Sequence, residues 1–190
     1  MAQDTHGHDA DNSIFKIGIN LTIACLLSGA IIAGVYSVTA PVAAQERENL
    51  KTKAMKELVA DAQSFKPIDG KTDWYAAVKD GKTLAYVVPA ESKGYGGAIK
   101  MVTAISPDGK VMSYKILSHN ETPGLGDKAS EPKFAKQFAG KSPGDLEVVK
   151  TPTDKNIQAL TGATITSRAV TKGVREAAEE VAKYAASQKK

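Results

Sequence analysis

Four hydroxyl side chains gather in the stretch Leu160-Thr161-Gly162-Ala163-Thr164-Ile165-Thr166-Ser167, just before a long amphipathic pattern. A helix that begins here would present unpaired backbone N–H groups and the positive end of its dipole, which favour an anion. Gly162 and Ala163 are small, so the backbone can approach a ligand closely. Arg168 and Lys172 follow in the first turns, where cations are unfavourable unless a negative group such as a phosphate lies nearby. Taken alone, these residues favour an ordinary helix cap, because Ser and Thr are common N-caps.

The segment 161–167 resembles the flavinylation motif of the FMN-binding domain family. That family includes the G subunit of the Rnf electron-transport complex and the C subunit of the sodium-pumping NADH:quinone reductase. In such proteins a flavin transferase esterifies the last Thr of the motif with the phosphate of FMN, and this position is Thr164 here. Many members carry an Asp where this chain has Gln158. The resemblance implies a covalent FMN on Thr164 through a phosphoester. The other cofactor-binding residues that it implies in this motif are Thr161, Gly162 and Ala163.

A second stretch, His119-Asn120-Glu121-Thr122-Pro123-Gly124-Leu125-Gly126, follows the last of four predicted strands. Its Pro and Gly residues predict a rigid loop, and a Leu between two glycines can lie on a flat ring. A wide turn at the end of a strand would explain the same residues. Members of the family carry Glu-Thr-Pro-Gly-Leu-Gly beside the flavin, which implies that Glu121, Thr122 and Leu125 contact the isoalloxazine ring.

The composition excludes several classes of protein. Cys25 is the one cysteine, which excludes a disulfide framework and a cysteine-ligated iron–sulfur cluster in the monomer. The 25 basic residues are interspersed with 21 acidic ones and aromatic residues make up 6%, so we expect no nucleic-acid binding. No His is paired with a nucleophile and no metal ligands cluster, so we predict neither catalytic residues nor a metal site. His119 is interpreted as structural or flavin-proximal.

The N-terminal region predicts a membrane anchor. No charged side chain occurs between Lys16 and Glu46, and the apolar core at 17–38 is long enough for a helix to cross about 30 Å of hydrocarbon. A cleaved signal peptide is the alternative, because Val42-Ala43-Ala44 resembles a peptidase site, but the apolar stretch exceeds the roughly 7–15 residues of such signals. We therefore predict a disordered cytoplasmic tail at residues 1–13 and a transmembrane helix at 14–40.

Two signals conflict over the orientation of the anchor. The basic residues Arg47, Lys51, Lys53 and Lys56 follow the apolar stretch, and the positive-inside rule would place that side in the cytoplasm. The family resemblance implies the opposite orientation, and a large C-terminal domain can translocate despite flanking charges. We expect a single-pass protein of the cytoplasmic (inner) membrane whose C-terminal domain is extracytoplasmic.

The rest of the chain predicts an α+β domain at residues 64–190, after a stalk or linker helix at 41–63. That helix would carry Leu50, Ala54 and Leu58 on one side and could stand free or lie on the domain. Asp-Gly pairs at 80–81 and 108–109 predict two hairpins and hence an antiparallel sheet with flanking helices. The predicted strands are 74–78, 84–88, 99–105, 111–117 and 146–150.

Between the hairpins, the stretch 94–97 is either a flexible turn or a place where a ligand approaches the backbone. A short helix at 131–139 should bury Phe134 and Phe138, and the last helix should bury Val170, Val174, Ala177, Val181 and Tyr184.

These expectations converge on a membrane-anchored electron carrier with covalent FMN. The resemblance implies an Rnf-type complex that couples ferredoxin:NAD electron transfer to ion translocation, with other membrane and peripheral subunits as partners and a flavin transferase for maturation. The chain would be a redox subunit of this translocase without independent catalysis. Two alternatives remain at this point: a standalone extracytoplasmic flavoprotein reductase, and an anchored interaction domain without a cofactor.

Overall fold

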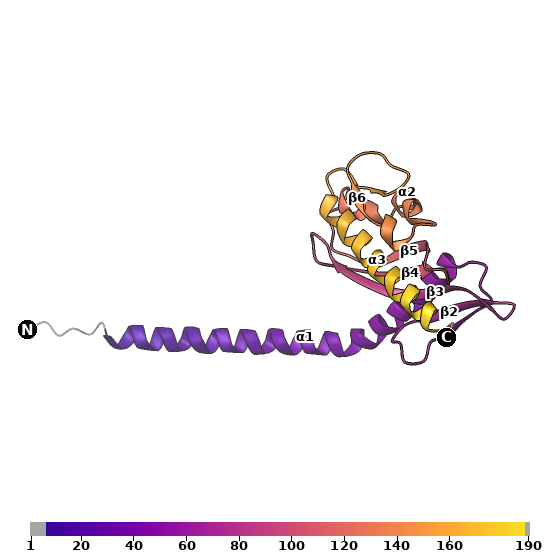
Figure 1. The fold of residues 1–190 in the computed structure, drawn as a ribbon. Helices are drawn as coiled ribbons and strands as arrows, with labels where there is room; N and C mark the ends of the chain where they lie inside the picture. The colour runs from indigo at the N-terminus through magenta and orange to yellow at the C-terminus, as the bar shows by residue number, and fades with distance from the viewer. Residues whose placement is uncertain (1–6, 189–190) are drawn as a thin grey trace, which may run out of the picture. The chain divides into compact units, whose positions relative to one another are not determined.

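The protein is represented by a computed structural model that describes residues 7–188 (Figure 1). The chain divides into an N-terminal unit, residues 1–48, and a domain, residues 49–190. Helix α1 (Gly7–Leu58) passes through Pro41 without ending. The disordered tail predicted for residues 1–13 is therefore wrong from Gly7 onward, where the backbone is helical, and residues 1–6 lie outside the described part. The predicted anchor and stalk are parts of one continuous helix.

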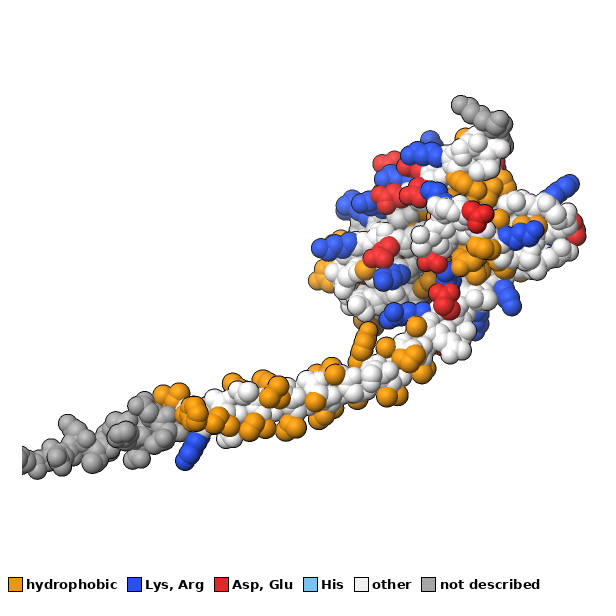
Figure 2. All heavy atoms as spheres, turned by 90° about the horizontal axis from the view of Figure 1, so that it is seen from below, with side chains coloured by type: hydrophobic (Ala, Val, Ile, Leu, Met, Phe, Trp, Pro, Cys, Tyr) orange, Lys and Arg blue, Asp and Glu red, His pale blue; other side chains and the backbone are white. Residues whose placement is uncertain are grey.

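The apolar part of α1 has the length and composition of a membrane span. The most apolar window within Ile14–Leu58 has a mean hydropathy of 2.0, and none of that window is buried within the protein. Figure 2 shows hydrophobic side chains along this helix. Large side chains such as Leu26 and Ile31 are each 67% exposed. Such a continuous apolar surface is unfavourable in water and favourable in hydrocarbon.

The predicted antiparallel sheet is present. It is a meander whose strands, in spatial and sequence order, are β1 (Ser64–Pro67), β2 (Tyr75–Lys79), β3 (Lys82–Lys93), β4 (Ala98–Ile105) and β5 (Val111–Ser118). Lys79 pairs with Lys82 across the first predicted hairpin, where Asp80 and Gly81 have φ angles of 50° and 76°. Two consecutive residues with positive φ give a turn whose twist matches the flanking strands, which explains why Asp-Gly marks it.

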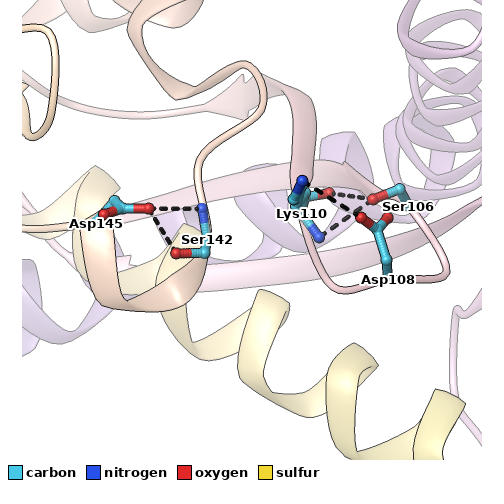
Figure 3. Close-up of polar contacts among 5 residues, drawn as sticks. All are labelled: Ser106, Asp108, Lys110, Ser142 and Asp145. Atoms are coloured by element: carbon cyan, nitrogen blue, oxygen red, sulfur yellow. Dashed lines mark hydrogen bonds and ion pairs between the residues drawn. The ribbon is translucent and has the colours of Figure 1, made fainter.

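The turn between β4 and β5 contains the second predicted Asp-Gly pair (Figure 3). The hydroxyl of Ser106 donates to the carbonyl of Lys110 at 2.9 Å, and the N–H of Lys110 donates back to that hydroxyl oxygen at 3.1 Å. Gly109 has a φ of 82°, which L side chains rarely adopt. Figure 3 also shows a second local polar contact, in which the N–H and hydroxyl of Ser142 both donate to Asp145. These hydrogen bonds lower the pKa of the Asp145 carboxyl.

Sequence reasoning missed β1 and the full length of β3. Strand β1 has four residues, of which only Phe65 is partly buried, so it shows no alternation of polar and apolar side chains. Strand β3 continues past the predicted residues 84–88 to Lys93, although Pro89 lies inside it. Its last residues pair with the first residues of β4, from Ala98 onward, so the sheet reaches the glycine-rich turn at 94–97.

Helix α3 (Thr164–Ser187) covers one face of the sheet (Figure 1). Its predicted apolar stripe is confirmed, since Val170, Val174, Ala177 and Val181 are buried and Tyr184 is partly buried. They pack against Ile99, Met101 and Ile105 on β4. Burying this stripe fixes the direction of α3 across the sheet and so the position of its first residues.

The opposite face of the sheet is covered by the end of α1, at residues 49–58, which belong to the domain. Met55 and Ala54 are buried against residues of the sheet such as Val87. Of the predicted contact residues, Ala54 is buried and Leu58 is partly buried against the sheet, but Leu50 is 45% exposed and Lys51 is buried instead. The alkyl chain of a lysine can pack like an apolar residue when its ammonium finds a partner. Here the Lys51 ammonium lies 2.6 Å from the carboxylate of Asp73.

The remaining elements connect the sheet to α3. They are η1 (Gly126–Ser130), α2 (Pro132–Ala135), η2 (Lys136–Phe138), η3 (Pro143–Asp145), β6 (Val148–Val149) and β7 (Ile157–Gln158). Phe134 and Phe138 are buried with their ring centroids 5.5 Å apart, which confirms that this predicted pair belongs to the core. The strand predicted at 146–150 is reduced to two residues, which pair with β7 in parallel.

Candidate functional site

A pocket of about 580 Å³ lies where α3 begins. Three parts of the chain line it: the β3–β4 turn at residue 95, the loop 121–126 after β5, and the segment 162–166. Cofactor and small-molecule sites typically have volumes of about 300–1,000 Å³. The structure therefore brings the two sequence motifs together around one cavity of suitable size. Of the predicted site residues, Glu121, Thr122, Leu125, Gly162, Ala163 and Thr164 line it.

The first turn of α3 has backbone donors available toward an anion. Ala163 is the N-cap residue, and no side chain caps the helix. The N–H of Ser167 makes the first hydrogen bond of the helix, to the carbonyl of Ala163 at 3.0 Å. Within the described chain, the N–H groups of residues 164–166 have no hydrogen-bond partner. The ordinary hydroxyl cap is therefore wrong, and the end of the helix can bind an anion.

Two of the four hydroxyls in the motif are used inside the protein. Ser167 is fully buried; its Oγ accepts the N–H of Leu160 at 2.9 Å and donates to the carbonyl of Ala163 at 2.9 Å. These bonds hold the turn before the helix. Thr166 is 2% exposed, and its hydroxyl donates to a carboxylate oxygen of Glu121. Neither hydroxyl is free to react.

The other two hydroxyls differ in position. Thr161 is exposed and lines a neighbouring hollow on the side of α2, not the pocket. Thr164 is partly buried and lines the pocket. Its hydroxyl has no hydrogen-bond partner among residues 7–188. In this motif, Thr164 alone combines a place in the pocket with an uncommitted hydroxyl.

Glu121 joins the three segments that enclose the pocket. Its carboxylate accepts the N–H of Gly96 at 2.9 Å, the N–H of Tyr95 at 3.2 Å and the hydroxyl of Thr166. Burial alone would raise the pKa of Glu121, but these hydrogen bonds outweigh it and lower the pKa. Both carboxylate oxygens thus already have protein donors. The structure gives Glu121 a role in holding the pocket together, which the sequence did not indicate.

Glycines permit this close approach. A Cβ added to Gly96 would lie 1.8 Å from the carbonyl oxygen of Asn120, and one added to Gly94 would lie 2.3 Å from the Glu121 carboxylate. Of the two interpretations of the stretch 94–97, the close approach is present, but the protein itself makes it, through the backbone of Asn120 and the side chain of Glu121. The N–H of Gly94 also donates to the carbonyl of Gly97 at 2.7 Å, which closes the turn.

Apolar side chains are exposed at the mouth of the pocket. In the described part of the domain, the exposed large apolar residues are Leu50, Tyr95, Met112, Leu125 and Ile165. Three of these, Tyr95, Leu125 and Ile165, line the pocket. Tyr95 is 72% exposed, and sequence reasoning missed it as a site residue. The feature of the sequence that could have identified Tyr95 is its position as an aromatic residue inside a glycine-rich turn. An exposed apolar cluster beside a cavity suits a flat ring that would cover it.

The two cations after the motif face a different hollow. Arg168 and Lys172 line a cavity of about 340 Å³ between α3 and the segment 146–148, together with Arg175. Neither residue lines the pocket at Thr164. The structure thus does not place them around an anion in that pocket, as the sequence suggested.

Comparison with known proteins identifies the family. A family model described as FMN-binding domain matches residues 94–179, a range that contains every residue of the pocket. The G subunit of the proton-translocating ferredoxin:NAD(+) oxidoreductase complex of Clostridium ljungdahlii is 59% identical over 174 residues, which cover 91% of this chain and 94% of that protein. This chain belongs to the family of G subunits of ion-translocating oxidoreductase complexes.

Other comparisons extend the similarity. The G subunit of the Na(+)-translocating ferredoxin:NAD(+) oxidoreductase complex of Acetobacterium woodii is 33% identical to this chain, and the match covers 85% of this chain and 88% of that protein. Among solved structures, NqrC of Shewanella oneidensis matches with a TM-score of 0.51 and 22% identity, over 67% of this chain and 73% of that one. At this level of identity the structural match shows a shared fold. The family assignment therefore rests on the sequence relatives.

Proposed function

We propose that this chain is the flavin-carrying electron-transfer subunit of an Rnf-type complex that couples ferredoxin:NAD electron transfer to ion movement, with FMN attached through its phosphate to Thr164. The relatives that match most of this chain are named as G subunits of such complexes, and the matched domain family is described as FMN-binding. The observation that carries the covalent attachment is the uncommitted hydroxyl of Thr164 at the pocket. The other hydroxyls of the motif are hydrogen-bonded or lie outside the pocket.

Attachment requires Thr164 to act as a nucleophile toward phosphorus. Its Oγ forms the new P–O bond, the bond from phosphorus to the leaving group of the flavin donor breaks, and the hydroxyl proton is released. A separate flavin transferase would catalyse this step, since the pocket contains no histidine to act as a base. The free N–H groups of residues 164–166 would then stabilise the negative charge of the diester.

The pocket also offers surfaces for the ring of FMN. Leu125 and Tyr95 present apolar surface at its mouth, and Thr122 lines it between the two motifs. Glu121 keeps the loop in place through its three hydrogen bonds. FMN, when bound, supplies the one- and two-electron chemistry, and the protein supplies its position and surroundings. A covalent tether maintains a high effective concentration even where the other contacts are weak.

The anchor places this chemistry at a membrane. We propose that residues 14–40 cross the cytoplasmic membrane once, with the N-terminus inside and the flavin domain extracytoplasmic. The apolar window of α1 supports the crossing by length and composition. The other subunits of the complex would provide the electron donor and acceptor for the flavin.

Intact mass of the full chain tests the attachment. The chain is produced in its membrane together with a flavin transferase, extracted in detergent and compared with Thr164→Val and Thr164→Ser. We expect an addition equal to FMN less one water, mapped to residue 164, in the wild type and in the serine variant, which keeps a hydroxyl. The valine variant should be colourless. A native chain of unmodified mass, or a valine variant that still carries the flavin, would rule out the proposal. Co-purification with other membrane subunits tests the place in a complex.

A further inference from the structure

One face of α3 presents three cations that follow Thr164 along the helix. Arg168, Lys172 and Arg175 follow Thr164 at spacings that return to the same face of a helix with about 3.6 residues per turn. At a rise of about 1.5 Å per residue, the row extends roughly 16 Å along the helix axis. All three cations line the 340 Å³ hollow, which is separate from the pocket of the two motifs. We call Arg168, Lys172 and Arg175 the cationic row.

The cations of this row are available to a partner. Arg168 is exposed and makes no ion pair with any residue from 7 to 188. Lys172 and Arg175 reach Glu176 and Glu179 only at 3.8 and 3.9 Å, with side chains that are 62% and 44% exposed. Exposed pairs of this kind contribute only about 0–1 kcal/mol, so a partner carboxylate can replace them at small cost.

The opposite side of the hollow offers little apolar surface to a partner. It is formed by Leu146, Glu147 and Val148, at and just before β6. Leu146 is 2% exposed, and Val148 is partly buried. Glu147 is the one carboxylate among the lining residues, against three cations. A partner segment that carries acidic side chains fits such a hollow, because the cations outnumber the carboxylate.

We infer that the cationic row and the adjoining hollow form the docking surface for the flavin-attaching enzyme, which would present an acidic segment there. The inference rests on the proposed attachment at Thr164. An enzyme that acts on the Thr164 hydroxyl must contact the face of α3 on which that residue lies. The cations continue along that face and away from the pocket, so they can hold the enzyme while the flavin enters the pocket. Opposite charges in such a surface raise the rate of encounter and fix the register.

The test measures the rate of flavin attachment to the full chain in detergent, with a purified flavin transferase and its flavin donor, at several salt concentrations. The double variant Arg168→Glu/Lys172→Glu reverses the charge next to Thr164. Lys183→Glu is the control for a charge reversal elsewhere on α3, because Lys183 is exposed on the same helix but lies outside the hollow. Thermal unfolding of each variant verifies its fold, and Arg168→Gln replaces the double variant if that one does not fold.

We expect the double variant to lower kcat/KM for attachment at least about tenfold at low salt through KM, with kcat unchanged. Charges on exposed surfaces are screened over about 3 Å at 1 M salt, compared with about 10 Å at 0.1 M, so the difference should shrink as salt rises. Lys183→Glu should resemble the wild type.

Two results would overturn the inference. Equal rates for the wild type and the double variant would show that the row does not dock the enzyme. A loss confined to kcat would assign the cations to the phosphoryl transfer itself and not to docking. A third result would concern the proposed function itself. If the wild-type chain accepts no flavin, the proposed attachment at Thr164 is wrong, and the docking inference fails with it.

Discussion

Replacing Glu121 with alanine removes the acceptor of three hydrogen bonds that join the parts of the pocket wall. These bonds connect the loop after β5 to the β3–β4 turn at Tyr95 and Gly96, and to Thr166 in the first turn of α3. Each hydrogen bond to a charged group contributes about 1.5–3 kcal/mol, and water that enters the pocket can replace part of them. The hydrogen bond from the Tyr95 N–H is long, at 3.2 Å, so its contribution lies at the lower end of this energy range. We therefore expect Glu121→Ala to lower the free energy of unfolding by about 3–6 kcal/mol.

A loss of this size would be a large part of the roughly 5–15 kcal/mol that stabilises an ordinary domain. Glu121→Gln keeps the shape of the side chain but places an amide NH₂ against one of the donors. One hydrogen bond is then lost and the others are weakened, since the acceptor is neutral. We expect the glutamine variant to lose about 1–3 kcal/mol, less than the alanine variant.

The fluorescence of Trp74 follows the unfolding of the domain without a label. It is the one tryptophan of the chain, and it is 5% exposed in the core beneath α3. Unfolding in urea is measured on the full chain in detergent and without flavin, so that the loss of a cofactor does not contribute. Glu180→Ala is the control, because Glu180 is exposed on α3 and such substitutions change stability by about 0.5 kcal/mol or less. If Glu121→Ala costs no more than this control, the carboxylate does not hold the pocket together.

Two further predictions concern the same loops. The hydrogen bonds lower the pKa of Glu121 below its ordinary value of 4.5, so its contribution to stability is fully present above pH 4.5 and is lost as the pH falls through the lower folded value. Urea unfolding as a function of pH should show this loss in the wild type and less of it in Glu121→Gln; parallel curves would contradict the assignment. Gly96→Ala should destabilise the domain by about 2 kcal/mol or more, because its Cβ would lie 1.8 Å from a backbone oxygen. Gly144→Ala, where a Cβ meets nothing within 4 Å, should stay within about 0.5 kcal/mol in the same urea titrations, and equal effects would show that the turn relaxes.

The sequence by itself determined the antiparallel hairpins and the buried face of the last helix. The Asp-Gly pairs at 80–81 and 108–109 predicted the hairpins, because few residues adopt positive φ without strain. The apolar stripe that begins at Val170 predicted which face of α3 is buried. These features depend on neighbours along the chain, and local chemistry is enough to identify them. The two motifs also resembled those of one family before their positions in space were known.

Only the tertiary structure decided how the site is built. The 94–97 turn and the first turn of α3 lie far apart in sequence, and Glu121 joins them by accepting hydrogen bonds from both. No local pattern shows that this carboxylate has its partners within the protein, or that Tyr95 stands exposed beside Leu125 and Ile165. Among the four hydroxyls of the last motif, the fold alone distinguishes Thr164, because it assigns hydrogen bonds to Thr166 and Ser167 and turns Thr161 away. A residue's type shows what it can bond to, whereas the packing of distant segments decides which of those bonds are made.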